Sequence, residues 1–256
     1  MNTAITQITS YTKESFTSTL RNGKIVTHDI YTQGSGTKVL ILIQELPGIG
    51  QETLALADRF VAQGYTVVLP HLFGKIGKTA TIINMVKVFC MRKQFSVFAK
   101  NQSSPIVDFL SDLCTMMKER HQVKGVAVIG MCLTGNFAIS LMANENVLAG
   151  FASQPSLPLK KQGFIHMSDE EVTAVKNRLD QIGPMHCGRL QGDKICAAER
   201  FDALDKEFNS DRQRIILHQL PGDGHSILTL DFVDKEGHPT KNALQEVIGY
   251  FDNQLN

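Results

Sequence analysis

Residues 38–45, KVLILIQE, contain five consecutive apolar residues with no polar residue between them. A strand with one face in water alternates apolar and polar residues, whereas a parallel strand covered by helices on both faces does not. A chain that buries such a segment needs a layer of helices on each side of it. The run therefore predicts a strand deep inside a parallel sheet.

The rest of the chain repeats the alternation of an apolar strand and an amphipathic helix. Further strands are predicted at 66–70, 125–130, 147–153, 185–193 and 214–220, and helices at 51–65, from 104–105 onward, 133–143, 167–179, 197–208 and 242–255. This rhythm is typical of an α/β fold with a mostly parallel central sheet and helices on both faces. Ser168 and Glu171 have the spacing of a capping box. Asn22-Gly23 predicts a hairpin turn within 17–37.

One segment, residues 71–103, interrupts this rhythm. It mixes apolar and basic residues without a clean period. Long excursions of this kind in α/β proteins are often lids or binding loops, although a surface helix pair with no role in chemistry fits equally well. We expect one domain over 1–256 that carries this excursion.

Composition excludes several classes of protein. The 256 residues are 43% hydrophobic and 20% charged, with a formal net charge of +1 and no dense basic run, which argues against a nucleic-acid partner. No apolar run is long enough to span a bilayer, and the first residues lack the pattern of a signal peptide. Five cysteines, an odd number, indicate free thiols in a reducing compartment. We therefore expect a cytoplasmic protein without a membrane partner.

A cysteine occupies the point where a predicted strand meets a predicted helix, in VIGMCLTGNF at 128–137. In the nucleophile elbow G-x-S-x-G, small flanking residues let the backbone turn sharply and expose the nucleophile. Here Gly130 takes the first small position, Cys132 the nucleophile position and Thr134 the second small position. A thiol there lies at the positive end of a helix, and the amide of Leu133 can face a developing oxyanion. A buried cysteine with no catalytic role is the simpler alternative.

Two further strands end at polar residues that suit this nucleophile. In the hydrolase order, an acid and then a histidine follow the nucleophile, each on a loop after a later strand. Asp193 follows MHCGRLQ (185–191) at the end of the strand predicted at 185–193, and His225 follows the strand at 214–220. Asp223 is a rival acid, although its closeness to His225 in sequence favours a turn role. Each of these residues taken alone is more often a turn or loop residue.

These motifs together resemble the dienelactone hydrolase family, a cysteine-dependent branch of the α/β-hydrolase superfamily. The resemblance rests on LIQELPGIG, GMCLTG, LQGDKI and GDGHS in this order, and it covers most of the chain. It implies an α/β-hydrolase fold and hydrolysis of an ester or lactone, of the carboxymethylenebutenolidase type, through an acyl-thioester. It implies a small-molecule substrate and no metal or organic cofactor.

Carried over by motif, Cys132 is the nucleophile, His225 the general base and Asp193 the group that orients it. Glu45 matches a glutamate that pairs with the resting thiol in the family and is displaced when substrate arrives. The resemblance also implies that the amide of Leu46 joins that of Leu133 in the oxyanion hole.

The sequence departs from the family at two places. The family has Gly-Gly after the leucine of the elbow, whereas this chain has Thr134-Gly135, and the threonine can tighten the turn or donate a hydrogen bond. The family also binds its substrate carboxylate with arginines. Here no arginine closely follows His225, and Arg92 is the only arginine in the excursion. Arg92 is therefore the one candidate for substrate binding, and an ester or lactone other than dienelactone itself is at least as well supported.

Two alternatives stay open beside this interpretation, and a zinc site is set aside. A zinc site of His186, Cys187 and Cys196 has a spacing that fits no common ligand pattern. A stress-response or glyoxalase-type protein would use Glu45 and Cys132 without the acid and histidine. A non-catalytic binding protein would keep the fold and use the pocket or the excursion for a ligand. The sequence determines neither the substrate nor the oligomeric state.

Overall fold

The computed structural model describes residues 5–46, 48–74, 76–77, 104–156, 163–165 and 167–256. Its core is an eight-stranded sheet in the order β1-β2-β4-β3-β5-β6-β7-β8. The strands are β1 (Thr12–Thr19), β2 (Ile25–Gln33), β3 (Lys38–Ile43), β4 (Tyr65–Pro70), β5 (Val126–Met131), β6 (Val147–Ser153), β7 (Met185–Leu190) and β8 (Ile215–Leu220). The strands from β4 to β8 are parallel, while β1 and β2 form an antiparallel edge. The predicted fold class is confirmed.

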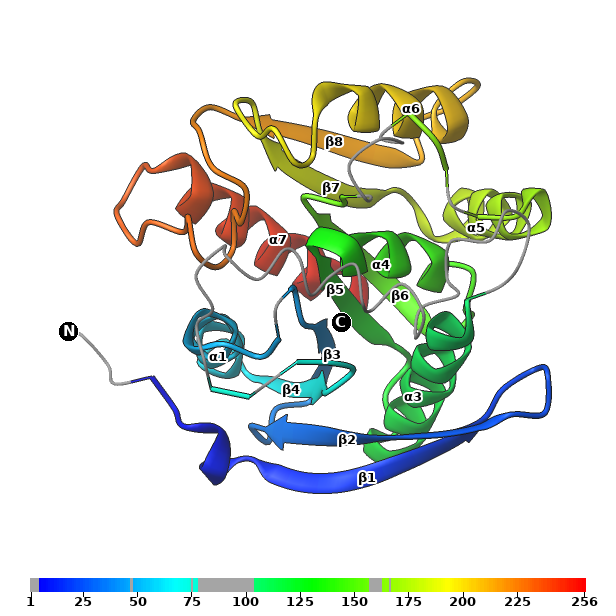
Figure 1. Cartoon of the computed structure of the whole chain (residues 1–256), viewed down its shortest axis with the longest axis vertical. Helices are drawn as coiled ribbons and strands as arrows, with labels where there is room; N and C mark the ends of the chain where they lie inside the picture. The colour runs from blue at the N-terminus through cyan, green and yellow to red at the C-terminus, as the bar shows by residue number, and fades with distance from the viewer. Residues whose placement is uncertain (1–4, 47, 75, 78–103, 157–162, 166) are drawn as a thin grey trace.

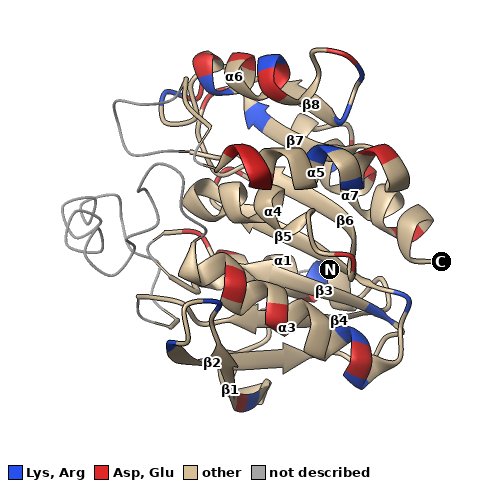
Figure 2. Cartoon of the chain, turned by 90° about the vertical axis from the view of Figure 1, so that its right-hand side faces the viewer, with Lys and Arg blue, Asp and Glu red and all other residues tan. Residues whose placement is uncertain are grey.

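Helices cover both faces of this sheet (Figure 1). They are α1 (Gln51–Val61), α3 (Pro105–His121), α4 (Gly135–Leu141), α5 (Asp169–Ile182), α6 (Ala198–Phe208) and α7 (Pro239–Leu255). Helices α1 and α7 lie on one face, and α3, α4, α5 and α6 lie on the other. Charged residues lie mostly on the helices and the connecting segments, and the central strands carry few of them (Figure 2).

Strand β3 shows why an apolar run without alternation belongs in this place. Val39, Ile41 and Ile43 pack in the cluster under α3 and α4, whereas Leu40 and Leu42 pack in the cluster under α1 and α7. All five side chains are completely buried. Burial of each such side chain contributes about 1.5–3 kcal/mol relative to exposure, so the run strongly favours a central position.

Local signals in the sequence position several element ends. The hairpin between β1 and β2 turns at Gly23, whose φ of 80° suits a residue without a side chain. The predicted capping box of α5 is present, with Ser168 accepting from the amide of Glu171 at 3.2 Å and the Glu171 carboxylate accepting from the amide of Ser168 at 2.9 Å. Helix α7 begins at Pro239, earlier than predicted. His238 is its N-cap, and proline suits the first helical position because the amide there has no partner within the helix.

Not every boundary matched the prediction. The helix predicted over 133–143 is a 3₁₀ turn (Cys132–Thr134) followed by α4, which ends at Leu141. Of the excursion predicted at 71–103, residues 75 and 78–103 lie outside the described part of the chain, and Arg92 lies among them. No helix in the described ranges is long and apolar enough to cross a membrane. The prediction of one domain over 1–256 stays a prediction.

The parallel strands bring their carboxyl ends to one edge of the sheet, where ligands of open α/β sheets bind. Glu45 follows β3, and Cys132 follows the neighbouring strand β5. Asp193 follows β7, and His225 follows its neighbour β8. The fold therefore gathers four sequence-predicted site residues at this edge.

Candidate active site

Cys132 lies in a strained turn directly after β5. Its φ is 57°, a conformation that costs a residue with a side chain about 1–3 kcal/mol. A Cβ added at Gly130 would lie 2.1 Å from the carbonyl oxygen of Thr134, and one added at Gly135 would lie 2.9 Å from Cα of Pro155. Small residues are therefore required on both sides of the cysteine, as in a nucleophile elbow.

Thr134 holds this turn together through its buried hydroxyl. The hydroxyl oxygen accepts from the amide of Met131 at 2.8 Å. It also lies 3.0 Å from the carbonyl oxygen of Gln44 and 2.9 Å from that of Met131, either of which can accept its proton. Since Gln44 follows β3 and Met131 ends β5, the threonine joins the ends of two adjacent strands. A glycine at this position has no group that makes this link.

His225 is held by Asp193, whose side chain is completely buried. Nδ1 of His225 and Oδ2 of Asp193 are 2.7 Å apart. The other carboxylate oxygen accepts from the amides of Ile195 at 2.7 Å and Cys196 at 2.9 Å. Of the two candidate acids, Asp193 makes the bond to the histidine, and the Asp223 carboxylate lies against Gly192 instead.

The imidazole of His225 has a strongly perturbed pKa. Burial lowers the pKa, but the hydrogen bond to Asp193 and the nearby Cys132 side chain outweigh burial and raise it to about 10. Nε2 is buried and has no hydrogen-bond partner of ordinary geometry among the described residues, yet Cys132 is close enough to affect the pKa. Sulfur forms long and weakly directional hydrogen bonds, so this effect does not require a bond of ordinary geometry. The raised pKa makes this imidazole a stronger proton acceptor than a free histidine.

The loop that carries His225 is anchored by Asp231, which the sequence analysis missed. Its Oδ2 accepts from the amides of His225 and Ser226, each at 2.7 Å. Gly224 has a φ of 115° and is packed against the same carboxylate. An acid six residues after a histidine is a weak signal in sequence, because loop aspartates are common.

Glu45 is buried next to this loop. Its carboxylate accepts hydrogen bonds from Ser226 Oγ at 2.9 Å, from the Thr229 hydroxyl, and from Gln154 Nε2 at 3.4 Å. Burial raises the pKa of Glu45, and the bonds from Thr229 and Ser226 partly oppose this. None of the hydrogen bonds among described residues joins Glu45 to Cys132. The pairing of Glu45 with the thiol stays a prediction, and Ser226 and Thr229 are partners that the sequence did not indicate.

The two amides expected to form an oxyanion hole directly follow Glu45 and Cys132 in the chain. Leu133 is part of the 3₁₀ turn that begins at Cys132, and Leu46 is the residue after Glu45. Neither amide donates a hydrogen bond to a residue that the structure describes. Both are therefore available for a ligand oxygen.

The three residues considered for a zinc site lie in different surroundings. His186 lies on β7 toward α7, the thiol of Cys187 is fully buried, and Cys196 Sγ donates to the carbonyl of Pro155 at 3.3 Å. Within the described ranges, no group of three or more His, Cys, Asp or Glu side chains is arranged to hold a metal ion.

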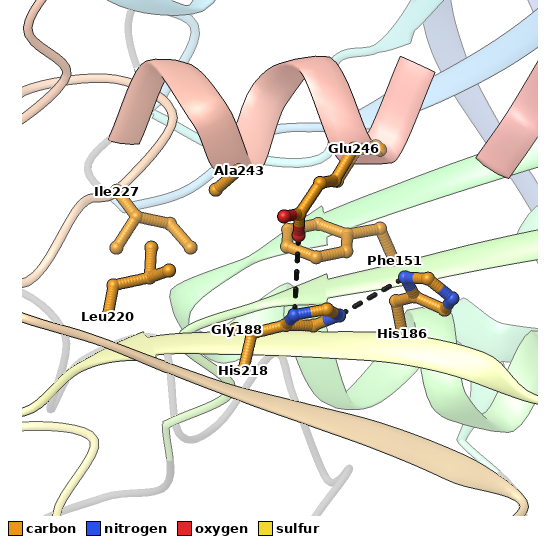
Figure 3. Close-up of a pocket in the computed structure, with 9 residues that line it drawn as sticks. Phe151, His186, Gly188, His218, Leu220, Ile227, Ala243 and Glu246 are labelled. Carbon is orange, nitrogen blue, oxygen red and sulfur yellow. Dashed lines mark hydrogen bonds and ion pairs between the residues drawn. The ribbon is translucent and has the colours of Figure 1, made fainter. Parts of the chain in front are cut away.

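His186 belongs instead to a histidine pair under α7 (Figure 3). Its Nδ1 is 3.2 Å from Nε2 of His218, and its ring stacks on Tyr250 with centroids 4.1 Å apart. Nδ1 of His218 is 3.5 Å from the Glu246 carboxylate. Burial, followed by the charge of His218, lowers the pKa of His186 to about 4. The surrounding side chains leave no room for a water molecule, so this hollow is a packed interface.

Comparisons with known proteins concern the family and the fold. A model of the dienelactone hydrolase family matches residues 29–255. The hydrolase tropI of Talaromyces stipitatus is 25% identical over 150 residues, which are 57% of this chain and 52% of that protein. The match thus spans about half the length of this curated relative.

Solved structures resemble the fold at low sequence identity. A candidate dienelactone hydrolase of Klebsiella pneumoniae has a TM-score of 0.64 and 14% identity over 94% of this chain and 99% of its own. An esterase of Pyrococcus furiosus has a TM-score of 0.60 and 13% identity over 96% of this chain and 94% of its own. At these identities the likeness concerns the fold.

The hydroxyl of Thr134 is expected to stabilise the elbow. Thr134→Val keeps the shape but leaves the buried amide of Met131 without its acceptor, and we expect a loss of about 1–3 kcal/mol in the free energy of unfolding. Thr134→Ser keeps the hydroxyl and is the matched control. Urea unfolding of the three proteins measures the effect. Equal stability of the valine and serine variants would contradict it.

The histidine pair is expected to make stability depend on pH. Because the pKa of His186 falls from 6.5 to about 4 in the fold, the unfolded chain binds the proton more readily, and stability is lost as pH drops through this range. His186→Phe keeps the stacking on Tyr250 and removes the titration. Its unfolding free energy should therefore vary less between pH 6.5 and 4. A pH slope as steep as that of the wild type would show that other groups cause it.

Proposed function

Since this chain belongs to the dienelactone hydrolase family, we propose that it hydrolyses an ester or lactone through Cys132, His225 and Asp193. The observation that carries the proposal is the buried hydrogen bond between Nδ1 of His225 and the carboxylate of Asp193, next to a cysteine held in a strained elbow. Nucleophile, base and orienting acid come from three separate strand ends in the hydrolase order.

The first half of the reaction acylates the cysteine. His225 takes the thiol proton, and the Cys132 thiolate attacks the carbonyl carbon of the substrate. The amides of Leu133 and Leu46 stabilise the negative oxygen of the tetrahedral intermediate. When the intermediate collapses, the ester C–O bond breaks and the leaving alkoxide takes the proton from His225. The product is an acyl-thioester, which stays joined to the alcohol when the substrate is a lactone.

Hydrolysis of the thioester completes the cycle. His225 removes a proton from water, and the hydroxide attacks the thioester carbonyl. The C–S bond then breaks, the thiolate recovers the proton from the imidazolium, and the carboxylic acid leaves. Asp193 orients the imidazole throughout, because its carboxylate is held by the amides of Ile195 and Cys196 and bonds to Nδ1 of His225. The scheme uses no metal or organic cofactor.

Glu45 is proposed to control the charge of the resting thiol. A carboxylate beside a thiol accepts its S–H and disfavours a second negative charge nearby. Its position after β3, next to the elbow after β5, supports this role. Ser226, Thr229 and Gln154 use three of the roughly four acceptor positions of the same carboxylate, which leaves one for the thiol.

The substrate class is proposed no more narrowly than an ester or lactone. Arg92, the candidate for binding a substrate carboxylate, lies outside the described residues. The segment after His225 presents Ser226 and Thr229 to Glu45 rather than a guanidinium to the site. A neutral ester or lactone is therefore consistent with the described part of the site.

Cys132→Ala is expected to abolish ester hydrolysis. With p-nitrophenyl acetate, the wild type should turn over and the variant should fall by about 10³-fold or more, because the nucleophile is lost. Cys114→Ala removes a buried thiol of α3 and should keep wild-type activity. Steady-state rates for the three proteins test the role of the thiol. Equal activity in wild type and Cys132→Ala would exclude the mechanism.

The variants Asp193→Asn and Glu45→Gln distinguish a triad mechanism from one that uses only Glu45 and Cys132. In the triad, Asp193→Asn loses about 10³–10⁴-fold in kcat because the imidazole is no longer oriented, and Glu45→Gln loses much less. The rate of Cys132 alkylation by iodoacetamide should instead rise in Glu45→Gln. If Glu45→Gln were inactive and Asp193→Asn fully active, the stress-response or glyoxalase-type alternative would replace the triad.

A further inference from the structure

Arg189 is a buried cation that the reaction scheme does not use. It lies on β7 and is 2% exposed. Its guanidinium donates four hydrogen bonds: to the carbonyl oxygens of Cys196 at 2.8 Å, Gln191 at 3.1 Å and Asp193 at 3.2 Å, and to Gln219 Oε1 at 3.2 Å. Three of these acceptors are main-chain atoms of the loop that carries Asp193.

The hydrogen bonds form a continuous chain from Arg189 to the imidazole. Arg189 holds the main chain on both sides of Asp193. The amides of Ile195 and Cys196 in the same loop then hold one carboxylate oxygen of Asp193, and the other oxygen bonds to His225. Cys196 takes part twice, since its carbonyl accepts from Arg189 and its amide donates to Asp193. A shift of this loop would therefore move the carboxylate away from the histidine.

The chemistry of the guanidinium suits this arrangement. A buried charge is costly unless it is well hydrogen-bonded, and no ion pair among the described residues includes Arg189. Its planar fork instead fits several carbonyl oxygens at fixed angles, which a flexible ammonium does not. The ring of Phe201, 5.7 Å from the guanidinium carbon, supports it from α6. The cation is thus bound by the loop that it orders.

We propose that Arg189 is a positioning residue of the hydrolytic triad, which keeps the Asp193 carboxylate on Nδ1 of His225 by fixing the loop at residues 191–196. The inference rests on the proposed function, because it assigns Arg189 a role through Asp193. It also predicts an effect on His225 that is measurable without any substrate.

The kinetic test compares Arg189→Met and Arg189→Lys with a matched control. Arg189→Met should lower kcat for p-nitrophenyl acetate by about 10- to 100-fold with little change in KM, because a loosened acid orients the base poorly. Arg189→Lys should recover only part of the loss. Arg214→Met removes another buried arginine, 6% exposed at the start of β8 and paired with Asp180, and should keep the wild-type kcat.

A double variant tests whether Arg189 acts through Asp193. In the Asp193→Asn background, Arg189→Met should change kcat by less than about twofold, since the residue through which it acts is already disabled. A full loss in both backgrounds would overturn the proposal, because it would show an effect independent of the acid.

The imidazole of His225 gives a readout that does not depend on hydrolysis. The bond to Asp193 raises the pKa of His225. NMR titration of the ring, assigned with His225→Asn, should show this pKa falling by about one pH unit or more in Arg189→Met. Arg214→Met should leave it unchanged. If Arg189→Met does not fold, the same titration is measured on Arg189→Lys.

These measurements separate the two proposals. An unchanged His225 pKa in a folded Arg189 variant would overturn the role of Arg189, whether or not the wild type hydrolyses esters. A lowered His225 pKa in the Arg189 variant, together with no ester turnover by the wild type, would keep the role of Arg189 in positioning the pair and overturn the proposed activity alone.

Discussion

The backbone of Cys132 is held at a φ of 57°, and the rest of the site is arranged around this strained turn. The strain persists because neighbouring parts of the fold oppose its release. Gly130 lets the turn close on the carbonyl of Thr134, and the Thr134 hydroxyl ties the turn to the end of β3. Asn136 adds a further bond, from Nδ2 to the carbonyl of Leu133 at 3.0 Å. The cysteine is thereby presented at the sheet edge.

Buried charges around this turn are stabilised mainly by peptide groups and hydroxyls. Asp193 is held by main-chain amides, Glu45 by hydroxyls, and Arg189 by main-chain carbonyls. Arg200, whose pKa burial lowers to about 10, donates to the side chain of Asn136 and so reaches the elbow. Dipoles that are fixed by the fold stabilise a charge without the reorganisation that water requires. This arrangement gives His225 an oriented acid in a site that excludes most solvent.

Elements with strong local signals were predicted well from the sequence. The apolar run of β3, the turn at Gly23 and the capping box at Ser168 each depend on residues that lie close together in the chain. Boundaries were less accurate where a tertiary contact decides them. The turn after Cys132 is a 3₁₀ helix rather than the first turn of α4, because Thr134 bonds back to Met131 and across to β3. The bond across to the end of β3 joins residues far apart in the chain, so local propensities do not predict it.

The sequence by itself determined the α/β architecture and the order of Cys132, Asp193 and His225 along the chain, because burial of uninterrupted apolar strands requires helices on both faces and parallel strands end at one edge. It left open whether Thr134 tightens the turn or donates a hydrogen bond. Only the tertiary structure decided that Asp193 rather than Asp223 bonds His225, that Ser226 and Thr229 hold Glu45, and that Arg189 holds the acid loop. These partners are up to 184 residues apart, and a hydrogen bond between them exists only after the strands have been placed in order.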